Sequence, residues 1–141
     1  MVKDKIILPT GWRWVKLGDM CHFIRGVSFT PQETKLIPDT GYLPILRAGN
    51  ISETLDTEND LLWVTSKNVS IEQRLQAGDI AICMASGSPT VVGKTAQLKK
   101  DFSGSVGAFC GIIRPKDLTQ SDYISYWLRS PDFTKWRNGQ A

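Results

Sequence analysis

The chain has 141 residues, of which 41% are hydrophobic and 22% are charged, and these values are typical of a folded soluble protein. Its length predicts a single domain, residues 1–141, that buries about two thirds of the surface of its unfolded chain. No apolar run reaches the roughly 18 residues of a membrane span, and residues 2–9 lack the apolar core of a secretory signal. The three cysteines are widely spaced without a C-x-x-C pair, which argues against a disulfide framework or a zinc site. They favour a reducing compartment, so we expect a cytoplasmic protein.

The net charge of +3 is mild, but its distribution along the chain is uneven. Residues 53–60 form an acidic stretch, whereas basic residues outnumber acidic ones between Lys67 and Lys116. This basic half is suited to face a polyanion. A solvated surface without a partner is the plainer interpretation, and charge alone favours it.

The first half of the chain predicts short strands and turns. Trp12, Trp14 and Lys16 fall on one side of a predicted strand, with the tryptophans packed near it. Thr30 followed by Pro31 and Glu33 has the pattern of a capped short helix. Residues 42–47 predict a strand, and Pro44 places it at a sheet edge or a strand start.

The second half predicts a buried strand centre followed by helices. Residues 80–85 are apolar on both faces, which is typical of a central strand, and residues 106–115 predict a further buried strand. Shorter strands are predicted at 61–64 and around 91–98. Two helices follow, one starting near residues 119–122 and one opening at Pro131 and stopping at Gly139. The pattern indicates an α+β fold, a strand-rich mixed sheet body of short strands with helices toward the C-terminus.

The segment 86-SGSPTVVGKT-95 ends like a phosphate-binding P-loop, G-x-x-x-x-G-K-[ST]. The spacing fails, because Ser88 stands where the first glycine is required. Pro89 lacks an N–H group to offer a phosphate, and residues 96–104 are too short for the crossover helix that a P-loop needs. The same residues suit a turn between two strands, held out into solvent.

No catalytic constellation is recognisable in the sequence. The single histidine, His22, adjoins Cys21, and neighbours in a strand point to opposite faces. Residues 103–107 do not fit the G-x-S-x-G elbow, and no [DN]-P-P-[YF] string of a nucleic-acid methyltransferase occurs. The acidic stretch 53–60 lacks the spacing and glycine of a calcium loop. We therefore favour a binding module without catalytic, metal or cofactor residues.

Five blocks in order resemble one protein family. Residues 8–19 resemble its opening L-P-x-G-W-x-x-x-x-L-G-D, and residues 42–51 its P-hydrophobic-hydrophobic-R-x-x-N-I segment. Residues 77–94 resemble its G-D-hydrophobic…S-G…G-K block. Residues 108–115 and 123–130 resemble its hydrophobic-R-P and Y-hydrophobic-x-Y-x-L-x-S ending. The chain thus looks like a target recognition domain of a type I restriction-modification specificity subunit.

This resemblance implies recognition of one half-site of a split target in double-stranded DNA. The partners it implies are the methyltransferase (modification) subunits and the restriction subunit, which hold S-adenosylmethionine and ATP. Family members usually carry two such domains, each followed by a long helix. The chain is accordingly expected to be either a fragment of a two-domain subunit or a stand-alone half.

The expected DNA contacts combine charge with hydrogen-bonding side chains. Phosphates are expected to be bound by Lys67, Arg74, Lys94, Lys99 and Lys100. Bidentate readers of bases are expected at Arg47, Asn50 and Asn68, and small donors at Ser66, Ser86, Ser88 and Thr90. Each has a structural alternative: Arg47 pairs with an acid, Asn50 caps a turn, and the lysines are merely solvated.

Two other functions stay open from the sequence. The apolar tail helices, with Trp127 and Trp136, suit a protein-interaction module that docks other subunits. The Gly93-Lys94-Thr95 turn leaves a small nucleotide-dependent enzyme as a third possibility.

Overall fold

The first of two sheets forms the centre of the molecule. The computed structural model describes residues 7–88 and 90–140, with the side chains of 139 and 140 excepted. This sheet has the strand order β1-β8-β5-β6, and each neighbouring pair is antiparallel. Its strands are β1 (Cys21–Arg25), β5 (Ile80–Cys83), β6 (Thr95–Gln97) and β8 (Cys110–Pro115).

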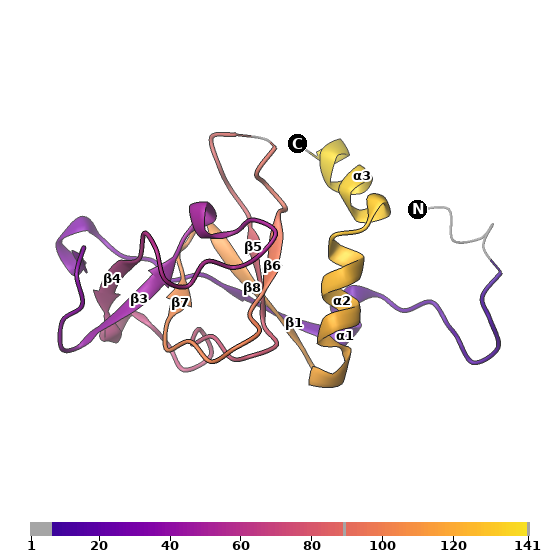
Figure 1. Cartoon of the computed structure of the whole chain (residues 1–141), viewed down its shortest axis with the longest axis horizontal. Helices are drawn as coiled ribbons and strands as arrows, with labels where there is room; N and C mark the ends of the chain where they lie inside the picture. Colours follow the sequence, from indigo (N-terminus) through magenta and orange to yellow (C-terminus); the bar gives the residue numbers. More distant parts are fainter. Residues whose placement is uncertain (1–6, 89, 141) are drawn as a thin grey trace.

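The second sheet is mixed and lies at the opposite end from the C-terminal helices (Figure 1). Its order is β2-β4-β3-β7, in which β3 and β7 run parallel and the other pairs antiparallel. The strands are β2 (Thr34–Lys35), β3 (Tyr42–Leu46), β4 (Leu62–Thr65) and β7 (Ser105–Val106). The prediction of a strand-rich mixed body with helices toward the C-terminus is confirmed.

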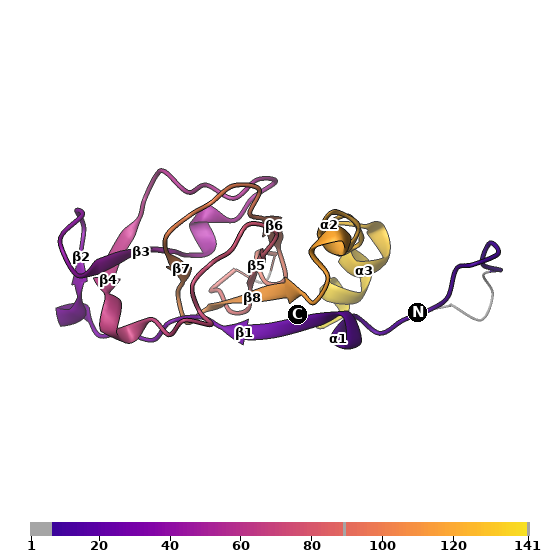
Figure 2. The ribbon, with the colours of Figure 1, turned by 90° about the horizontal axis from the view of Figure 1, so that it is seen from below.

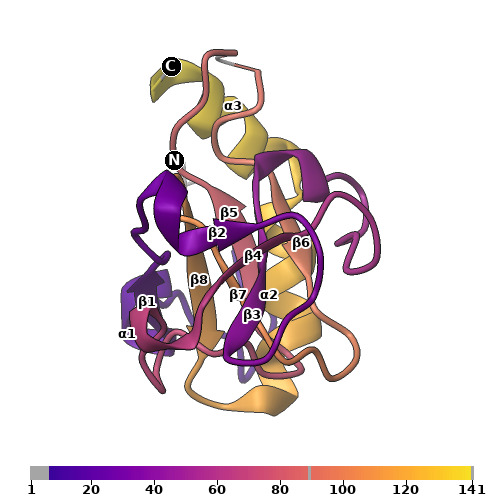
Figure 3. The same ribbon diagram turned by 90° about the vertical axis from the view of Figure 1, so that its left-hand side faces the viewer.

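Helices are short and gather at one end of the central sheet. The α-helices are α1 (Leu17–Met20), α2 (Ser121–Leu128) and α3 (Pro131–Gln140). Single 3₁₀ turns are η2 (Pro31–Glu33), η3 (Ala48–Asn50), η4 (Ser66–Asn68) and η5 (Leu118–Gln120). Figure 3 looks through the layers, with β2, β3 and β4 nearest, the central sheet behind them and α2 and α3 farthest away. No helix among the described residues is long and apolar enough to cross a membrane.

The core explains why β5 is apolar on both faces. Ile80 and Ile82 pack on the helical side with Leu128, whereas Ala81 and Cys83 face the second sheet. All four β5 residues are buried, and β5 lies between β8 and β6. The prediction of a buried central strand is confirmed.

The capped turn predicted at Thr30 is also confirmed, as η2. The backbone N–H of Thr30 donates to Oε1 of Glu33 at 2.8 Å, and the Thr30 hydroxyl donates to the same oxygen at 2.9 Å. These hydrogen bonds stabilise the charged carboxylate, so the pKa of Glu33 is lowered.

The strand predicted at Trp12–Lys16 is wrong. Residues 12–16 belong to an arm that leads into α1 and lies away from the body (Figure 2). Trp12 and Trp14 are 60% and 42% exposed, so they are not packed as expected. The alternating pattern is present, but no strand among the described residues pairs with it, and an unpaired strand leaves its backbone groups to water.

Residues 106–115 form parts of two strands instead of one. A turn, closed by the N–H of Cys110 donating to the carbonyl of Gly107 at 2.9 Å, divides β7 from β8. β7 joins the second sheet and β8 the central one, so this turn carries the chain between sheets. The helix stop at Gly139 is likewise wrong, since α3 continues to Gln140.

Pro44 occupies an interior strand in spite of lacking an N–H. It is the third residue of β3, which has β4 on one side and β7 on the other. β7 pairs only with Ile45 and Leu46, so the ladder between β3 and β7 requires no N–H from Pro44. β3 as a whole is therefore an interior strand, and its part up to Pro44 lacks a paired strand on the β7 side.

Candidate nucleic-acid interface

The loop from Met84 to Lys94 joins β5 to β6 and projects from the body (Figure 1). Ser86, Ser88 and Thr90 are all exposed on it. The N–H of Ser88 donates to Oγ of Ser86 at 3.1 Å, and the hydroxyls of Ser88 and Thr90 lie 3.0 Å apart. These bonds shape the loop and leave hydroxyl groups facing solvent. The predicted exposed turn between two strands is confirmed; Pro89 lies outside the described residues.

Gly93, Lys94 and Thr95, which resemble the end of a P-loop, lead from a turn into β6. Gly93 has φ +87°, a conformation that side chains disfavour, and a Cβ there would overlap the side chain of Arg137 on α3. The N–H of Gly93 donates to the Cys83 carbonyl at 2.7 Å, and β6 follows at Thr95. Because a strand follows in place of a helix, the segment is not a P-loop and offers no helix N-terminus to a nucleotide.

Arg47 and Ser86 are 39 positions apart in the sequence but share one concave surface. They line a hollow of about 920 Å³ together with Phe109 and Ser28. Arg47 is exposed at the end of β3, and its Nη2 donates to the carbonyl of Asp60 at 3.4 Å. This partner is a backbone oxygen and not a carboxylate, so the positive charge of Arg47 is not neutralised by it.

Asn50 is not available to read a base. Its side chain is buried with 3% exposure. The Oδ1 atom accepts the N–H of Arg47 at 2.9 Å, while Nδ2 donates to the carbonyls of Asp56 and Asn59 at 3.1 and 2.8 Å. The Asn50 amide thus links the turn after β3 to the following loop by hydrogen bonds. The alternative in which Asn50 caps a turn is the correct one.

Ser66, Lys67 and Asn68 form η4, directly after β4. Oδ1 of Asn68 accepts the Thr65 hydroxyl at 2.9 Å, and its Nδ2 donates to the carbonyl of Ser28 at 3.2 Å. These bonds hold η4 against one wall of the hollow. Asn68 and Ser66 are half-buried, whereas Lys67 is exposed.

Lys94, Lys99 and Lys100 are exposed on or just after the β5–β6 hairpin. Nζ of Lys100 lies 3.6 Å from Oε1 of Glu58, and both side chains are more than half exposed. An ion pair this exposed is weak. It shows that the acidic stretch, separate in sequence, lies beside the basic one in space.

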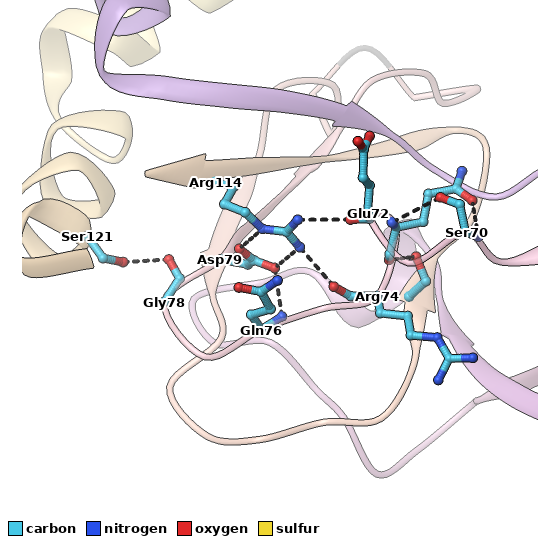
Figure 4. Close-up of polar contacts among 10 residues, drawn as sticks. Ser70, Glu72, Arg74, Gln76, Gly78, Asp79, Arg114 and Ser121 are labelled. Atoms are coloured by element: carbon cyan, nitrogen blue, oxygen red, sulfur yellow. Dashed lines mark hydrogen bonds and ion pairs between the residues drawn. The ribbon is translucent and has the colours of Figure 1, made fainter. Parts of the chain in front are cut away.

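Arg114 and Asp79 form a buried ion pair that local sequence patterns do not indicate (Figure 4). Asp79 is 0% exposed and receives Nε and Nη2 of Arg114 at 2.9 and 2.8 Å. The Arg114 guanidinium also donates to the carbonyls of Glu72 and Arg74 at 2.9 and 2.8 Å. Arg114 therefore fixes the 72–79 segment to β8 and is not part of a polyanion-binding surface. The side chain of Arg74 points away from this pair (Figure 4), so its charge is on the surface.

The chain is similar in sequence to two specificity subunits of type I restriction enzymes. No family model matches the chain. Over 123 residues it is 37% identical to the type I restriction enzyme StySPI specificity subunit of Salmonella potsdam, covering 87% of this chain and 27% of that protein. It is also 37% identical to the EcoKI specificity subunit of Escherichia coli K12, covering 87% and 26%. The chain is homologous to one part of the type I restriction specificity subunits.

This specificity-subunit homologue also shares its fold with solved structures. The HsdS subunit from Thermoanaerobacter tengcongensis superposes with a TM-score of 0.66 at 22% identity, over 89% of this chain and 29% of that one. A chain solved in work on complex assembly and conformational transition of the type I R-M system gives 0.69 at 22% identity, over 93% and 31%. The homologue spans about a quarter of the length of the curated relatives it matches.

The three cysteine thiols of the specificity-subunit homologue are buried. Burial raises the pKa of the Cys110 thiol to about 12 and raises those of Cys21 and Cys83 as well. These thiols are therefore protonated at neutral pH and are poor nucleophiles. Among residues 7–88 and 90–140, no cluster of three or more His, Cys, Asp or Glu is placed to hold a metal.

Proposed function

We propose that this chain is a single target recognition domain that binds double-stranded DNA and reads one half-site of a split target. The observation that carries the proposal is the 37% identity to two specificity subunits over 87% of the chain. The geometry supports it, because an exposed polar loop and Arg47, which forms no ion pair with a carboxylate among the described residues, border one hollow. The hollow thus offers one cation, Arg47, and hydroxyl donors for base edges, with Asp60 as the one acid among its lining residues.

The proposed contacts divide by chemistry. Exposed cations supply salt-dependent affinity for phosphates: Lys67, Arg74, Lys94, Lys99 and Lys100. Base edges are read by Arg47 and the loop hydroxyls of Ser86, Ser88 and Thr90, with Ser66 at the margin. Asn50 and Asn68 do not contact DNA in this proposal. Their side chains hold the turn after β3 and η4 in position.

The proposal makes the chain the non-catalytic specificity component of a type I complex. Methyltransferase (modification) subunits and a restriction subunit would supply the reactions, and the chain would need no cofactor. The names of the relatives support this role, since both are specificity subunits. The three free thiols are consistent with the cytoplasm, where we place the protein.

Selection from a random-sequence duplex pool tests the proposed function. The full chain, immobilised and incubated with the pool at low salt, should enrich one short consensus that covers a half-site. Pools passed over a matrix without protein provide the background. Absence of enrichment at low salt would count against DNA recognition.

A protein-interaction module is the second candidate. Tyr126 and Trp136 on the tail helices are 82% and 60% exposed. The apolar faces of the same helices, with Ile124, Leu128 and Phe133, are already used to cover the central sheet. Retention of a purified modification subunit without any DNA enrichment would favour this candidate over the first.

Replacing Lys99 and Lys100 together by alanine should weaken binding about equally for all DNA sequences. Each lost phosphate contact removes about 0.9 from the slope of log K against log salt, so the slope should flatten by up to about two. Titrations of the selected duplex between low and moderate salt measure this slope. The double variant Lys16→Ala/Lys35→Ala has the same charge change on the arm and on β2, and its slope should stay that of the parent. Equal slopes for the Lys99/Lys100 variant and the parent would remove both lysines from the contact set.

A further inference from the structure

Phe109 is a largely exposed aromatic residue in the hollow of the proposed DNA surface. It lies in the turn between β7 and β8, is 71% exposed, and is followed by Cys110 with 2% exposure. Solitary exposed apolar residues are common and need no explanation. Phe109 differs because it lines the same hollow as Arg47 and Ser86.

The backbone of Phe109 is tied to the base of the β5–β6 loop. Its carbonyl accepts the N–H groups of Met84 and Ala85 at 2.7 and 3.1 Å. The turn is closed by Cys110 N–H donating to Gly107 at 2.9 Å, and Gly107 N–H donates to Leu46 at 2.9 Å. The ring is thus presented from a fixed backbone that connects both sheets and the loop.

Arg47 lies directly beside this turn. A Cβ built on Gly107 would have Cγ of Arg47 at 3.7 Å and Cε1 of Phe29 at 3.8 Å. The stem of Arg47 therefore lies beside Gly107 in the turn that carries Phe109, and both Arg47 and Phe109 line the hollow. Because the backbone of Phe109 is held by hydrogen bonds, binding does not have to order the backbone of this turn.

Resting on the proposed function, we propose that Phe109 is a specificity-determining residue that contacts the methyl group of a thymine in the target half-site. A phenyl ring has no hydrogen-bonding group, so it distinguishes bases only by apolar contact. Thymine carries the one methyl group among the unmodified base edges in the major groove, and Phe is a suitable partner for it. Phe109 lines a hollow and does not project from a convex tip, so a ring lying against base edges fits better than a wedge between base pairs.

Replacing thymine by uracil tests this inference, because it removes only the methyl group. On the duplex selected by the parent chain, uracil at one thymine should weaken binding about fourfold, the effect of burying one methyl group. Phe109→Ala should bind the thymine and uracil duplexes equally, whereas Phe109→Leu should keep part of the difference. Tyr123→Ala, which removes an exposed aromatic ring on α2, should respond to uracil like the parent.

The outcomes separate the inference from the function on which it rests. No enrichment of any duplex overturns both. A selected consensus whose thymines all tolerate uracil in the parent overturns the inference alone, as does a Phe109→Ala variant that keeps the full fourfold response. A Phe109→Ala variant that weakens both duplexes equally while reducing DNA bending indicates a wedge and also overturns it. Because Phe109 is largely exposed, thermal unfolding of Phe109→Ala and Phe109→Leu should match the parent and show that both variants are folded.

Discussion

Replacing Asp79 by alanine is expected to lower the free energy of unfolding by about 3–5 kcal/mol. The carboxylate is fully buried, and it accepts two hydrogen bonds from Arg114 and one from the N–H of Gln76 at 2.7 Å. Its removal leaves a largely buried guanidinium without its counter-charge and a backbone N–H without its partner. For a domain whose whole stability is on the order of 5–15 kcal/mol, this loss is large.

Urea unfolding followed by circular dichroism measures this effect. Asp79→Asn keeps the shape and one acceptor oxygen, so it should fall between the parent and Asp79→Ala. The double variant Asp79→Ala/Arg114→Met removes the charge and its partner together, and it should be more stable than Asp79→Ala alone. A loss below about 1 kcal/mol for Asp79→Ala, within the range of exposed pairs, would show that the pair does not hold the 72–79 segment.

The ion pair has a functional consequence within the proposed function. The Arg114 guanidinium binds the carbonyls of Glu72 and Arg74, so it positions the backbone from which the side chain of Arg74 reaches solvent. Gly78, next to Asp79, accepts the Ser121 hydroxyl at 2.6 Å from the start of α2 (Figure 4). The ion pair and the Ser121–Gly78 hydrogen bond together connect β8, the 72–79 segment and the helical layer.

Replacing Gly26 by alanine is the second change with a large expected effect. Gly26 is buried at the end of β1, and its N–H donates to the carbonyl of Cys110 at 3.0 Å. A Cβ there would overlap the carbonyl of Gly107 and approach that of Cys110 at 2.8 Å. Both obstacles are backbone and cannot rotate away, so the strands must separate. Overpacking of this kind costs about 1–3 kcal/mol and occasionally more.

The same urea experiment checks Gly26→Ala against a matched glycine. Gly18 in α1 has no atom within 4 Å of an added Cβ, so Gly18→Ala should stay within about 0.5 kcal/mol of the parent. Within the proposals above, Gly26→Ala should also reduce the discrimination between thymine and uracil, because the displaced Gly107 turn carries Phe109. If Gly26→Ala and Gly18→Ala unfold at the same urea concentration, the close approach of β1 to this turn is not a constraint on the fold.

Several features were predictable from local sequence because their causes are local. An unbroken apolar run predicts a strand buried on both faces, and β5 is one. Small polar residues with glycine predict an exposed turn, and the 84–94 loop is exposed. Thr30 and Glu33 are three residues apart, so the capping interaction needs no distant partner. Helical spacing of apolar residues likewise predicted the two C-terminal helices.

Other features depended on contacts between residues far apart in the chain. The pattern of residues 12–16 suits a strand, but a strand needs a neighbour, and none pairs with it within residues 7–88 and 90–140. Residues 106–113 carry no charged side chain, so nothing local separates the part that joins β3 from the part that joins β5. Charge type alone did not show that Arg114 is paired internally while Arg74 is exposed, because the partner of Arg114 lies 35 positions away.

The sequence by itself determined the class of fold, the buried central strand, the exposed loop and the resemblance to specificity subunits. These follow from hydrophobic period, turn residues and short motifs, which act over a few residues. Only the tertiary structure decided that Arg47, Ser86 and Phe109 line one hollow, that Asn50 is a buried brace and that Asp79 neutralises Arg114. These depend on strand order and register, which are set by the packing of the whole chain and are not encoded in any single segment.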